Sequence, residues 1–205
     1  MILIAESGST KTNWLTQQQQ LFETIGFNPL FFSSSDIYSE LAKHELLNAH
    51  KENFTQIFFY GASCSSAERN KIVYNALQKF FPNASSISVD HDLKAAALAT
   101  YDGQKGIACI LGTGSNSCLF DGNKIYEEVP ALGYLLGDEG SGAYFGKKLL
   151  AHFLYHELPD ATMVLLKEKY AAEKEKIFEA VYKKPHANVY LASFAKAMTE
   201  STDTA

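Results

Sequence analysis

A short loop pattern occurs twice in this chain, each time after an apolar run. Met1–Ile4 leads into Gly8–Thr12, and Gly106–Leu111 leads into Gly112–Asn116. Glycine lets backbone N–H groups approach an anion that a Cβ would block, and Ser and Thr hydroxyls add donors without bulk. Two loops of this size and chemistry favour a protein that binds the phosphates of ATP. The residues assigned to phosphate are Gly8, Ser9, Thr10, Lys11, Thr12, Gly112, Thr113, Gly114 and Ser115.

The secondary structure expected around the two loops also repeats. Each loop is followed by a predicted hairpin, with strands at Asn13–Gln18 and Leu21–Ile25 in the first half and Asn116–Phe120 and Lys124–Val129 in the second. Both halves are therefore expected to contain a strand, a loop, a second strand, a turn and a third strand. This repeat predicts an α/β protein of two similar domains. We place the boundary near Gly103–Lys105, which gives domains 1–104 and 105–205.

Strand and helix signals fill the rest of the chain. Further strands are predicted at Ile2–Ala5, Gln56–Tyr60 and Ile87–Val89. Helices are predicted at about 35–50, from the capping signal Ser65–Glu68 to Pro82, at Asp92–Tyr101, and through 138–198 with breaks near Pro159 and Pro185.

Composition excludes several classes of protein. The 205 residues are 46% hydrophobic, which is enough for packed cores, and the net charge of −5 with scattered Lys and Arg argues against a nucleic-acid partner. No apolar run approaches the roughly 18 residues that cross a bilayer, and no basic leader precedes one, so we expect no membrane and a cytoplasmic location. Cys64, Cys109 and Cys118 lack CxxC spacing and predict reduced, mostly buried thiols.

The first loop is not a Walker phosphate loop. The G-x-x-x-x-G-K-[ST] pattern is absent, and no helix is expected directly after Lys11. A strand, turn and strand would have to hold phosphate in a different way. Taken alone, Gly8–Thr12 favours a plain β-turn with a solvated Lys11. The near-repeat at Gly112–Asn116 shifts the balance to the phosphate interpretation.

Three segments carry a resemblance to known families. Glu6–Thr12 resembles the first phosphate motif of the sugar kinase, Hsc70 and actin superfamily. Gly112–Asn116, followed about twenty residues later by Gly137–Gly142, resembles the N-acetylglucosamine kinase and BadF/BadG/BcrA/BcrD ATPase family. The resemblance spans nearly the whole chain and implies two ribonuclease-H-like domains that close around ATP and substrate.

The resemblance also implies roles for two carboxylates. Asp92 matches the catalytic Asp, which accepts the proton of the substrate hydroxyl during phosphoryl transfer. A helix N-cap is the competing interpretation, and the neighbouring His91 is assigned a structural role. Glu6, where many relatives have Asp, would organise Mg²⁺ or its waters near the phosphates. A plain strand-end carboxylate is the alternative for Glu6.

Sugar-binding residues follow from the same resemblance. Asp138 and Asn116 would bind sugar hydroxyls, and Asn28 lies in a loop that resembles a sugar-contacting one. Each has an alternative interpretation. Asp138 would open a helix and be favoured there by the helix dipole, and Asn28 with Pro29 would simply form a turn.

The expected function is that of an ATP- and Mg²⁺-dependent kinase for a small amino sugar such as N-acetylglucosamine. Relatives continue past the position of Ser201 with a glycine-rich adenosine motif, so we expect a second domain that is incomplete, truncated before that motif. Apolar surface left uncovered would favour association, which leaves a homodimer open. A BadF-type activator ATPase and a sugar or nucleotide sensor without catalysis remain the alternatives.

Overall fold

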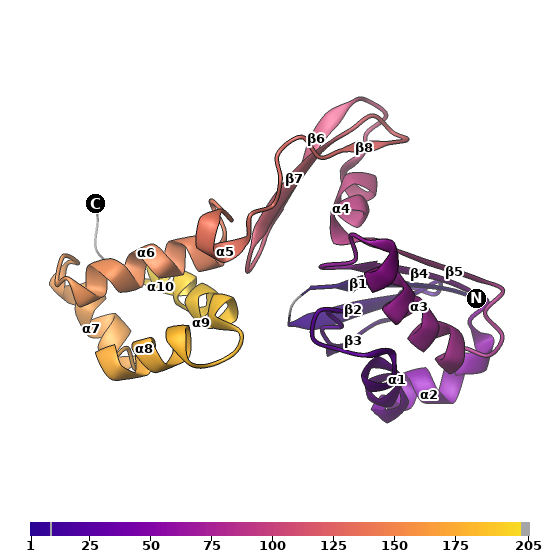
Figure 1. The fold of residues 1–205 in the computed structure, drawn as a ribbon, viewed down its shortest axis with the longest axis horizontal. Coiled ribbons are helices and arrows are strands. Elements are labelled where there is room, and N and C mark those ends of the chain that lie inside the picture. The colour runs from indigo at the N-terminus through magenta and orange to yellow at the C-terminus, as the bar shows by residue number, and fades with distance from the viewer. Residues whose placement is uncertain (9, 202–205) are drawn as a thin grey trace. The chain divides into compact units, whose positions relative to one another are not determined.

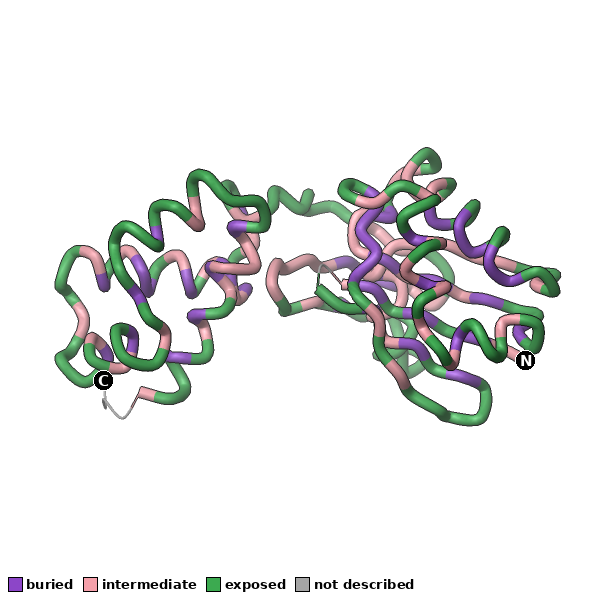
Figure 2. Tube along the Cα trace, turned by 90° about the horizontal axis from the view of Figure 1, so that it is seen from below, coloured by how far each residue is buried: buried purple, intermediate pink, exposed green. Residues whose placement is uncertain are grey.

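The structure is a computed structural model that describes residues 1–8 and 10–201. The described chain divides into two compact units (Figure 1). Unit 1 comprises Met1–Ala108 with Phe120–Ile125, and unit 2 comprises Cys109–Leu119 with the chain from Tyr126 onward. Each unit has its own apolar core, and buried and exposed positions alternate along the chain in both (Figure 2).

Unit 1 contains a mixed sheet with strand order β3-β2-β1-β4-β5. Its strands are β1 (Ile2–Ser7), β2 (Lys11–Thr16), β3 (Leu21–Ile25), β4 (Gln56–Gly61) and β5 (Ser86–His91). Strand β2 runs antiparallel to both β1 and β3, whereas β4 runs parallel to β1 and β5 runs parallel to β4. Side chains alternate between the faces of a strand. In β1, Leu3, Ala5 and Ser7 are buried accordingly, whereas Ile4 and Glu6 are exposed.

Helices cover this sheet and form the core of unit 1. They are α1 (Ser34–Lys43), α2 (Glu45–His50), α3 (Ala67–Phe80) and α4 (Asp92–Thr100), with a 3₁₀ turn at Lys51–Asn53. Leu41 of α1, Leu47 of α2 and Leu77 of α3 join Ala5 and Phe59 of the sheet in one apolar cluster. Helix α4 lies against β1, β4 and β5 and buries Leu93 and Ala97. The carboxyl ends of β1, β4 and β5 therefore meet at one edge of the sheet, where the predicted Glu6 and Asp92 lie.

One helix prediction in unit 1 is wrong. The pattern over 35–50 predicted a single helix, but the backbone is extended at His44, with φ −82° and ψ 110°, and separates α1 from α2. The His44 ring accepts a hydrogen bond from the N–H of Leu47 at 3.4 Å and so starts the second helix. By contrast, the predicted helix start at Ser65–Glu68 is confirmed, since Ser66 caps α3.

Unit 2 combines strands with a helical core. A sheet of order β6-β7-β8 is formed by β6 (Gly106–Leu111), β7 (Ser115–Phe120) and β8 (Ile125–Tyr126). Of these strands, residues 109–111, 115–119 and 126 belong to unit 2, and the others belong to unit 1. Strand β8 is shorter than the predicted strand Lys124–Val129. The helices are α5 (Gly133–Leu136), α6 (Gly142–Leu154), α7 (Asp160–Glu168), α8 (Lys174–Tyr182), α9 (Ala187–Ser193) and α10 (Ala197–Glu200), with a 3₁₀ turn at Phe194–Lys196. The predicted breaks near Pro159 and Pro185 are confirmed. No helix among the described residues is both long and apolar enough to span a bilayer.

The backbones of helices α6 and α9 lie close together, because glycine at two positions of α6 leaves no side chain between them. A Cβ built on Gly146 of α6 would lie 1.8 Å from the carbonyl oxygen of Leu191 in α9. One on Gly142 would lie 3.1 Å from the Cβ of Ala192. The small side chains at these positions therefore fix how closely the two helices pack. This packing also orients the start of α6, which borders the second glycine loop.

Candidate functional site

The first glycine loop is the tight connection between β1 and β2. The N–H of Gly8 donates to the carbonyl of Lys11 at 2.9 Å, and the N–H of Gly26 donates to the carbonyl of Thr10 at 3.0 Å. Strand β2 begins at Lys11, so a strand follows the loop, as the sequence predicted. Ser9, also assigned to phosphate, lies outside the described residues.

The hydroxyls of Ser7 and Thr12, on the two strands that flank this loop, form a hydrogen-bonded chain that supports it. Thr12 donates from Oγ1 to the carbonyl of Ile25 at 2.9 Å, and its oxygen lies 2.8 Å from the Oγ of Ser7. A hydroxyl has one proton, so Ser7 must donate to Thr12. Ser7 in turn accepts from the N–H of Phe27 at 2.9 Å. The Thr12 hydroxyl, assigned to phosphate, is thus used within the protein, and sequence reasoning missed Ser7.

Lys11 and Glu6, the two charged residues assigned to this site, are exposed. The Nζ of Lys11 lies 2.9 Å from the Oε1 of Glu23 on β3, and both side chains are more than half exposed. The Glu6 carboxylate accepts from the Nδ2 of Asn13 at 3.3 Å, because the two residues are opposite each other on β1 and β2. Among the described residues, no three His, Cys, Asp or Glu side chains gather into a group that could hold a metal.

Asp92 lies where β5 ends and α4 begins. Its Oδ1 accepts from the N–H of Leu93 at 2.9 Å and lies 3.3 Å from the Nε2 of His91. Within the part of the chain that the structure describes, its Oδ2 has no hydrogen-bond partner and is not buried. The N-cap interpretation is wrong, because the N-cap of α4 is His91 and Asp92 is the first helical residue. Asp92 therefore has one carboxylate oxygen that accepts a hydrogen bond, Oδ1, and one accessible oxygen, Oδ2, that accepts none from the described residues.

The charges around Asp92 distinguish it from its neighbour Asp90. Lys94, in the first turn of α4, forms an ion pair with Asp90. Cys64 is buried beside the two carboxylates, and burial, followed by the negative charge of Asp92, raises the pKa of its thiol to about 12. Burial also raises the pKa of Tyr60, which is opposite Asp90 in the sheet. Asp90 thus has a cation partner, whereas the side chain that meets Asp92 is an imidazole.

Asn28 has the local role of a turn residue. Its side chain is buried, and its Oδ1 accepts from the N–H of Leu30 at 2.9 Å. Its carbonyl accepts from the N–H groups of Phe31 and Phe32 at 2.9 and 3.0 Å. The turn interpretation therefore accounts for the Asn28 side-chain oxygen. Its assignment to sugar stays a prediction.

The second glycine loop and the Gly137–Gly142 segment contact each other in unit 2. The N–H groups of Gly142 and Ala143 donate to the carbonyls of Gly112 and Thr113 at 2.8 and 3.1 Å. Ser115, at the start of β7, donates from Oγ to the carbonyl of Glu139 at 2.9 Å. Two motifs about twenty residues apart in the sequence therefore form one structural element.

Asp138 does not open a helix, contrary to the sequence prediction. It has a left-handed backbone, with φ 57°, and α6 begins four residues later with Ser141 as its N-cap. The Ser141 Oγ accepts from the N–H of Tyr144 at 3.1 Å and so performs the capping. The Asp138 carboxylate instead lies against Gly114, where a Cβ would be 2.8 Å from its Oδ2. Gly114 therefore makes room for this side chain.

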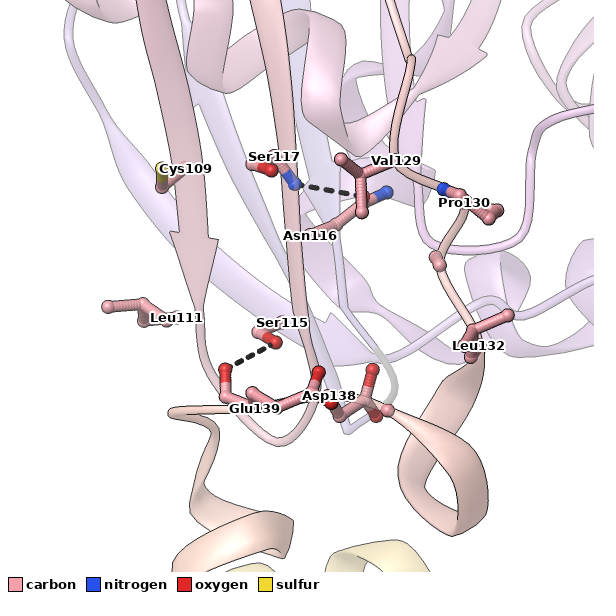
Figure 3. A pocket seen from close by; sticks show the side chains of 12 residues that line it. Cys109, Leu111, Ser115, Asn116, Ser117, Val129, Pro130, Leu132, Asp138 and Glu139 are labelled. Carbon is pink, nitrogen blue, oxygen red and sulfur yellow. Dashed lines mark hydrogen bonds between the residues drawn. The ribbon is translucent and has the colours of Figure 1, made fainter.

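A cavity of about 370 Å³ opens beside these motifs, entirely within unit 2 (Figure 3). Its polar lining is Ser115, Asn116, Ser117, Asp138 and Glu139, and its other lining residues are Cys109, Leu111, Val129, Pro130, Ala131, Leu132 and Gly137. The Oδ1 of Asn116 accepts from the N–H of Ser117 at 2.8 Å. Two assigned sugar residues, Asn116 and Asp138, are thus brought together. The apolar wall at 129–132 was missed, because its sequence carries no polar signal.

Comparison with known proteins gives matches among solved structures. A protein of Porphyromonas gingivalis provisionally described as an N-acetylglucosamine kinase is 38% identical, with a TM-score of 0.90 over 98% of this chain and 72% of that one. No protein-family model matches the chain, and no curated protein matches it.

More distant structures share the fold. A ROK family glucokinase from Streptomyces griseus, in complex with glucose and AMPPNP, is 16% identical with a TM-score of 0.54 over 93% of this chain and 73% of that one. MreB5 of Spiroplasma citri, bound to AMPPNP, is 13% identical with a TM-score of 0.53 over 89% of this chain and 61% of that one. These similarities confirm the predicted class, an α/β fold with ribonuclease-H-like domains of the actin-like ATPase type.

Proposed function

This chain belongs to the family of the Porphyromonas gingivalis protein within the sugar kinase and actin-like ATPase superfamily, and we propose that it transfers the γ-phosphate of ATP to a hydroxyl of an amino sugar. N-acetylglucosamine is the proposed sugar, because the relative with 38% identity is provisionally described as a kinase for it. The observation that carries the proposal is the open carboxylate oxygen of Asp92 at the edge of the unit 1 sheet.

Asp92 is proposed as the group that accepts the proton of the attacking hydroxyl. Phosphoryl transfer needs positioning and charge stabilisation more than covalent chemistry, but the acceptor oxygen must lose its proton as the new bond forms. A carboxylate with an unengaged oxygen can take that proton. Asp90 suits the role less well, because Lys94 is paired with it.

The unit 2 cavity is proposed as the sugar pocket. Asn116 and Asp138 supply an amide and a carboxylate for sugar hydroxyls, and Val129, Pro130 and Leu132 supply an apolar wall. Pockets for small polar ligands commonly combine apolar walls with a few placed polar groups. An N-acetyl group needs both kinds of surface, because its methyl is apolar and its amide is polar.

The two glycine loops are proposed to hold the phosphates of ATP. The residues proposed for this role are Gly8, Ser9, Thr10, Lys11, Gly112, Thr113, Gly114 and Ser115. Thr12 would instead stabilise the first loop through its hydrogen bond to the Ile25 carbonyl. Two structures of the same fold contain AMPPNP. Mg²⁺ commonly binds one or two carboxylates together with phosphate oxygens and waters. The exposed Glu6 carboxylate, with Asn13 beside it, fits such a site. When bound, the ion would neutralise phosphate charge.

Asp92→Asn tests the proposal. We expect kcat for N-acetylglucosamine phosphorylation to fall about 10²- to 10⁴-fold, because general-base catalysis contributes that much, while calorimetry detects sugar binding close to wild type. Asp90→Asn, two residues earlier in the chain and outside the proposed machinery, is the matched control and should keep kcat within a few fold. Near-normal turnover in Asp92→Asn, or no ATP consumption with any amino sugar by the wild-type protein, would refute the proposed function.

A further inference from the structure

We propose that Lys147 of α6 is a positioning residue for the unit 2 cavity. It holds the wall segment, residues 127–136, which carries the apolar wall of the cavity. The inference rests on the proposed function, because it takes this cavity as a sugar pocket. Lys147 does not line the cavity itself, so it would set the affinity for the sugar from outside the pocket.

The wall segment is exposed over almost its whole length. It follows the end of β8 at Tyr126, and its residues are exposed apart from the half-buried Tyr134. Val129 and Leu132, which belong to the wall, are 70% and 55% exposed, and both lie along one side of the cavity in Figure 3. Side chains this exposed bury little apolar surface and fix their own position weakly. The place of the wall must therefore be set by contacts made elsewhere in the segment.

Tyr134 attaches the wall segment to the helices of unit 2. Its side chain packs against the buried cluster that includes Leu150 and Phe153 of α6. Its carbonyl accepts a hydrogen bond from the Nζ of Lys147 at 2.9 Å. Hydrogen bonds from an ionised donor are shorter and stronger than those between neutral groups. The chain is therefore held two residues beyond Leu132, at a residue whose backbone and side chain are both attached.

The contact with the Tyr134 carbonyl distinguishes Lys147 from its neighbour Lys148. The ring of Tyr144 lies 6.0 Å from the Nζ of Lys147 and 5.8 Å from that of Lys148, so the two lysines share this contact. Within the part of the chain that the structure describes, no acidic side chain forms an ion pair with Lys147. Its ammonium group is thus available for the carbonyl, and Lys148 provides a matched control.

Helix α6 connects the wall segment to the second glycine loop. Its first N–H groups, those of Gly142 and Ala143, hold the Gly112 and Thr113 carbonyls, and Lys147 lies in the next turn. The wall and the loop are therefore attached to the same helix. Loss of the Lys147 donor would release the wall and leave the loop in place, so we expect weaker sugar binding with little change in the chemical step.

Three substitutions separate positioning from charge and packing. Lys147→Met keeps an unbranched apolar stem without the donor, Lys147→Arg keeps a charged donor, and Lys148→Met removes the same charge and the same contact with Tyr144. We expect the KM for N-acetylglucosamine to rise about tenfold in Lys147→Met, because one lost apolar contact costs that much, with kcat within about threefold of wild type. Lys147→Arg should recover most of the KM, and Lys148→Met should leave it unchanged. A fall in kcat at unchanged KM, or equal KM values in the two Met variants, would overturn the inference.

A measurement without sugar keeps the inference independent of the proposed activity. Relaxation of ¹⁵N nuclei reports picosecond-to-nanosecond motion of the backbone amides in the wall segment. We expect their order parameters to fall below about 0.6 in Lys147→Met and to match the wild-type protein in Lys148→Met. Unchanged order parameters in Lys147→Met contradict the positioning role even if the kinase activity stands. Lowered order parameters, with no amino sugar phosphorylated by the wild-type protein, remove the proposed function and keep Lys147 as the support of the wall.

Discussion

The two glycine loops look alike in sequence but are supported in different ways. Beside the first loop, the Ser7 and Thr12 hydroxyls form a hydrogen-bonded chain. It begins at the N–H of Phe27 and ends at the carbonyl of Ile25. The second has its Gly112 and Thr113 carbonyls held by the first N–H groups of α6, and the Asp138 carboxylate fills the space beside Gly114. The first loop depends on side-chain donors within its own hairpin, and the second depends on a helix about thirty residues away.

The difference shows that a repeated motif can keep its turn while its supports diverge. A strand, a glycine turn and a strand are local features that a short sequence can encode. The groups that hold the turn in place come from elsewhere in the fold and need share nothing between the two copies. Substitutions in the supports should therefore distinguish the loops more clearly than substitutions in the turns.

The largest expected effect is on the helix that supports the second loop. Gly146→Ala would push a methyl group into the Leu191 carbonyl, 1.8 Å from the built Cβ, so α9 must move away from α6. We expect a loss of about 3 kcal/mol in the free energy of unfolding, at the upper end of overpacking effects, measured by urea denaturation. Gly106→Ala is the control, because its Cβ would meet nothing closer than 4.0 Å. Equal stability of the two variants would contradict the close α6–α9 approach.

The next largest loss of stability is expected when the hydroxyl chain of Ser7 and Thr12 beside the first loop is broken. Ser7→Ala leaves the buried N–H of Phe27 and the oxygen of Thr12 without their partner. We expect about 2 kcal/mol of destabilisation, because unsatisfied buried polar groups cost about 1–3 kcal/mol each. Thermal unfolding of Ser7→Ala beside Ser7→Thr, which keeps the hydroxyl, measures the effect. Stability of Ser7→Ala equal to that of the wild-type protein would show that the hydroxyl is dispensable. Ser7→Thr keeps the hydroxyl but adds a methyl group at a fully buried position, so it reports the cost of overpacking.

Gly114→Ala should affect ligand binding at the second loop more than stability. The new Cβ would lie 2.8 Å from the Oδ2 of Asp138 and displace that carboxylate from its place beside the loop. We expect the sugar KM to rise about tenfold, equivalent to about 1.4 kcal/mol of binding free energy, with kcat less changed. Steady-state kinetics measures both constants, and the Gly106→Ala variant again serves as control. An unchanged KM would separate Asp138 from sugar recognition.

The smallest effect is expected for the surface ion pair beside the first loop. Lys11 and Glu23 are both more than half exposed, and exposed pairs contribute about 0–1 kcal/mol. Glu23→Gln should therefore change the free energy of unfolding by less than about 1 kcal/mol, and less still in high salt. Urea denaturation at two ionic strengths checks this. A larger change would place Lys11 among the structural supports of the loop.

Local signals in the sequence predicted the parts of the fold that depend on neighbouring residues. The hairpin after each glycine loop, the cap of α3 at Ser66 and the breaks near Pro159 and Pro185 all follow from short patterns. His44 was missed because its ring caps the next helix only after the chain turns. The left-handed Asp138 and the wall at 129–132 were missed because they depend on packing around Gly114 and on cavity shape.

The start of α6 limits how this protein can bind negative charge. In many nucleotide-binding folds, free N–H groups at a helix start hold a phosphate. Here the N–H groups of Gly142 and Ala143 point at the Gly112 and Thr113 carbonyls, and that of Tyr144 points at Ser141. An anion arriving at the second loop would find those amides already engaged, and the Ser115 hydroxyl already donates to the Glu139 carbonyl. Its oxygens would therefore have to bind to other donors, such as the Thr113 hydroxyl.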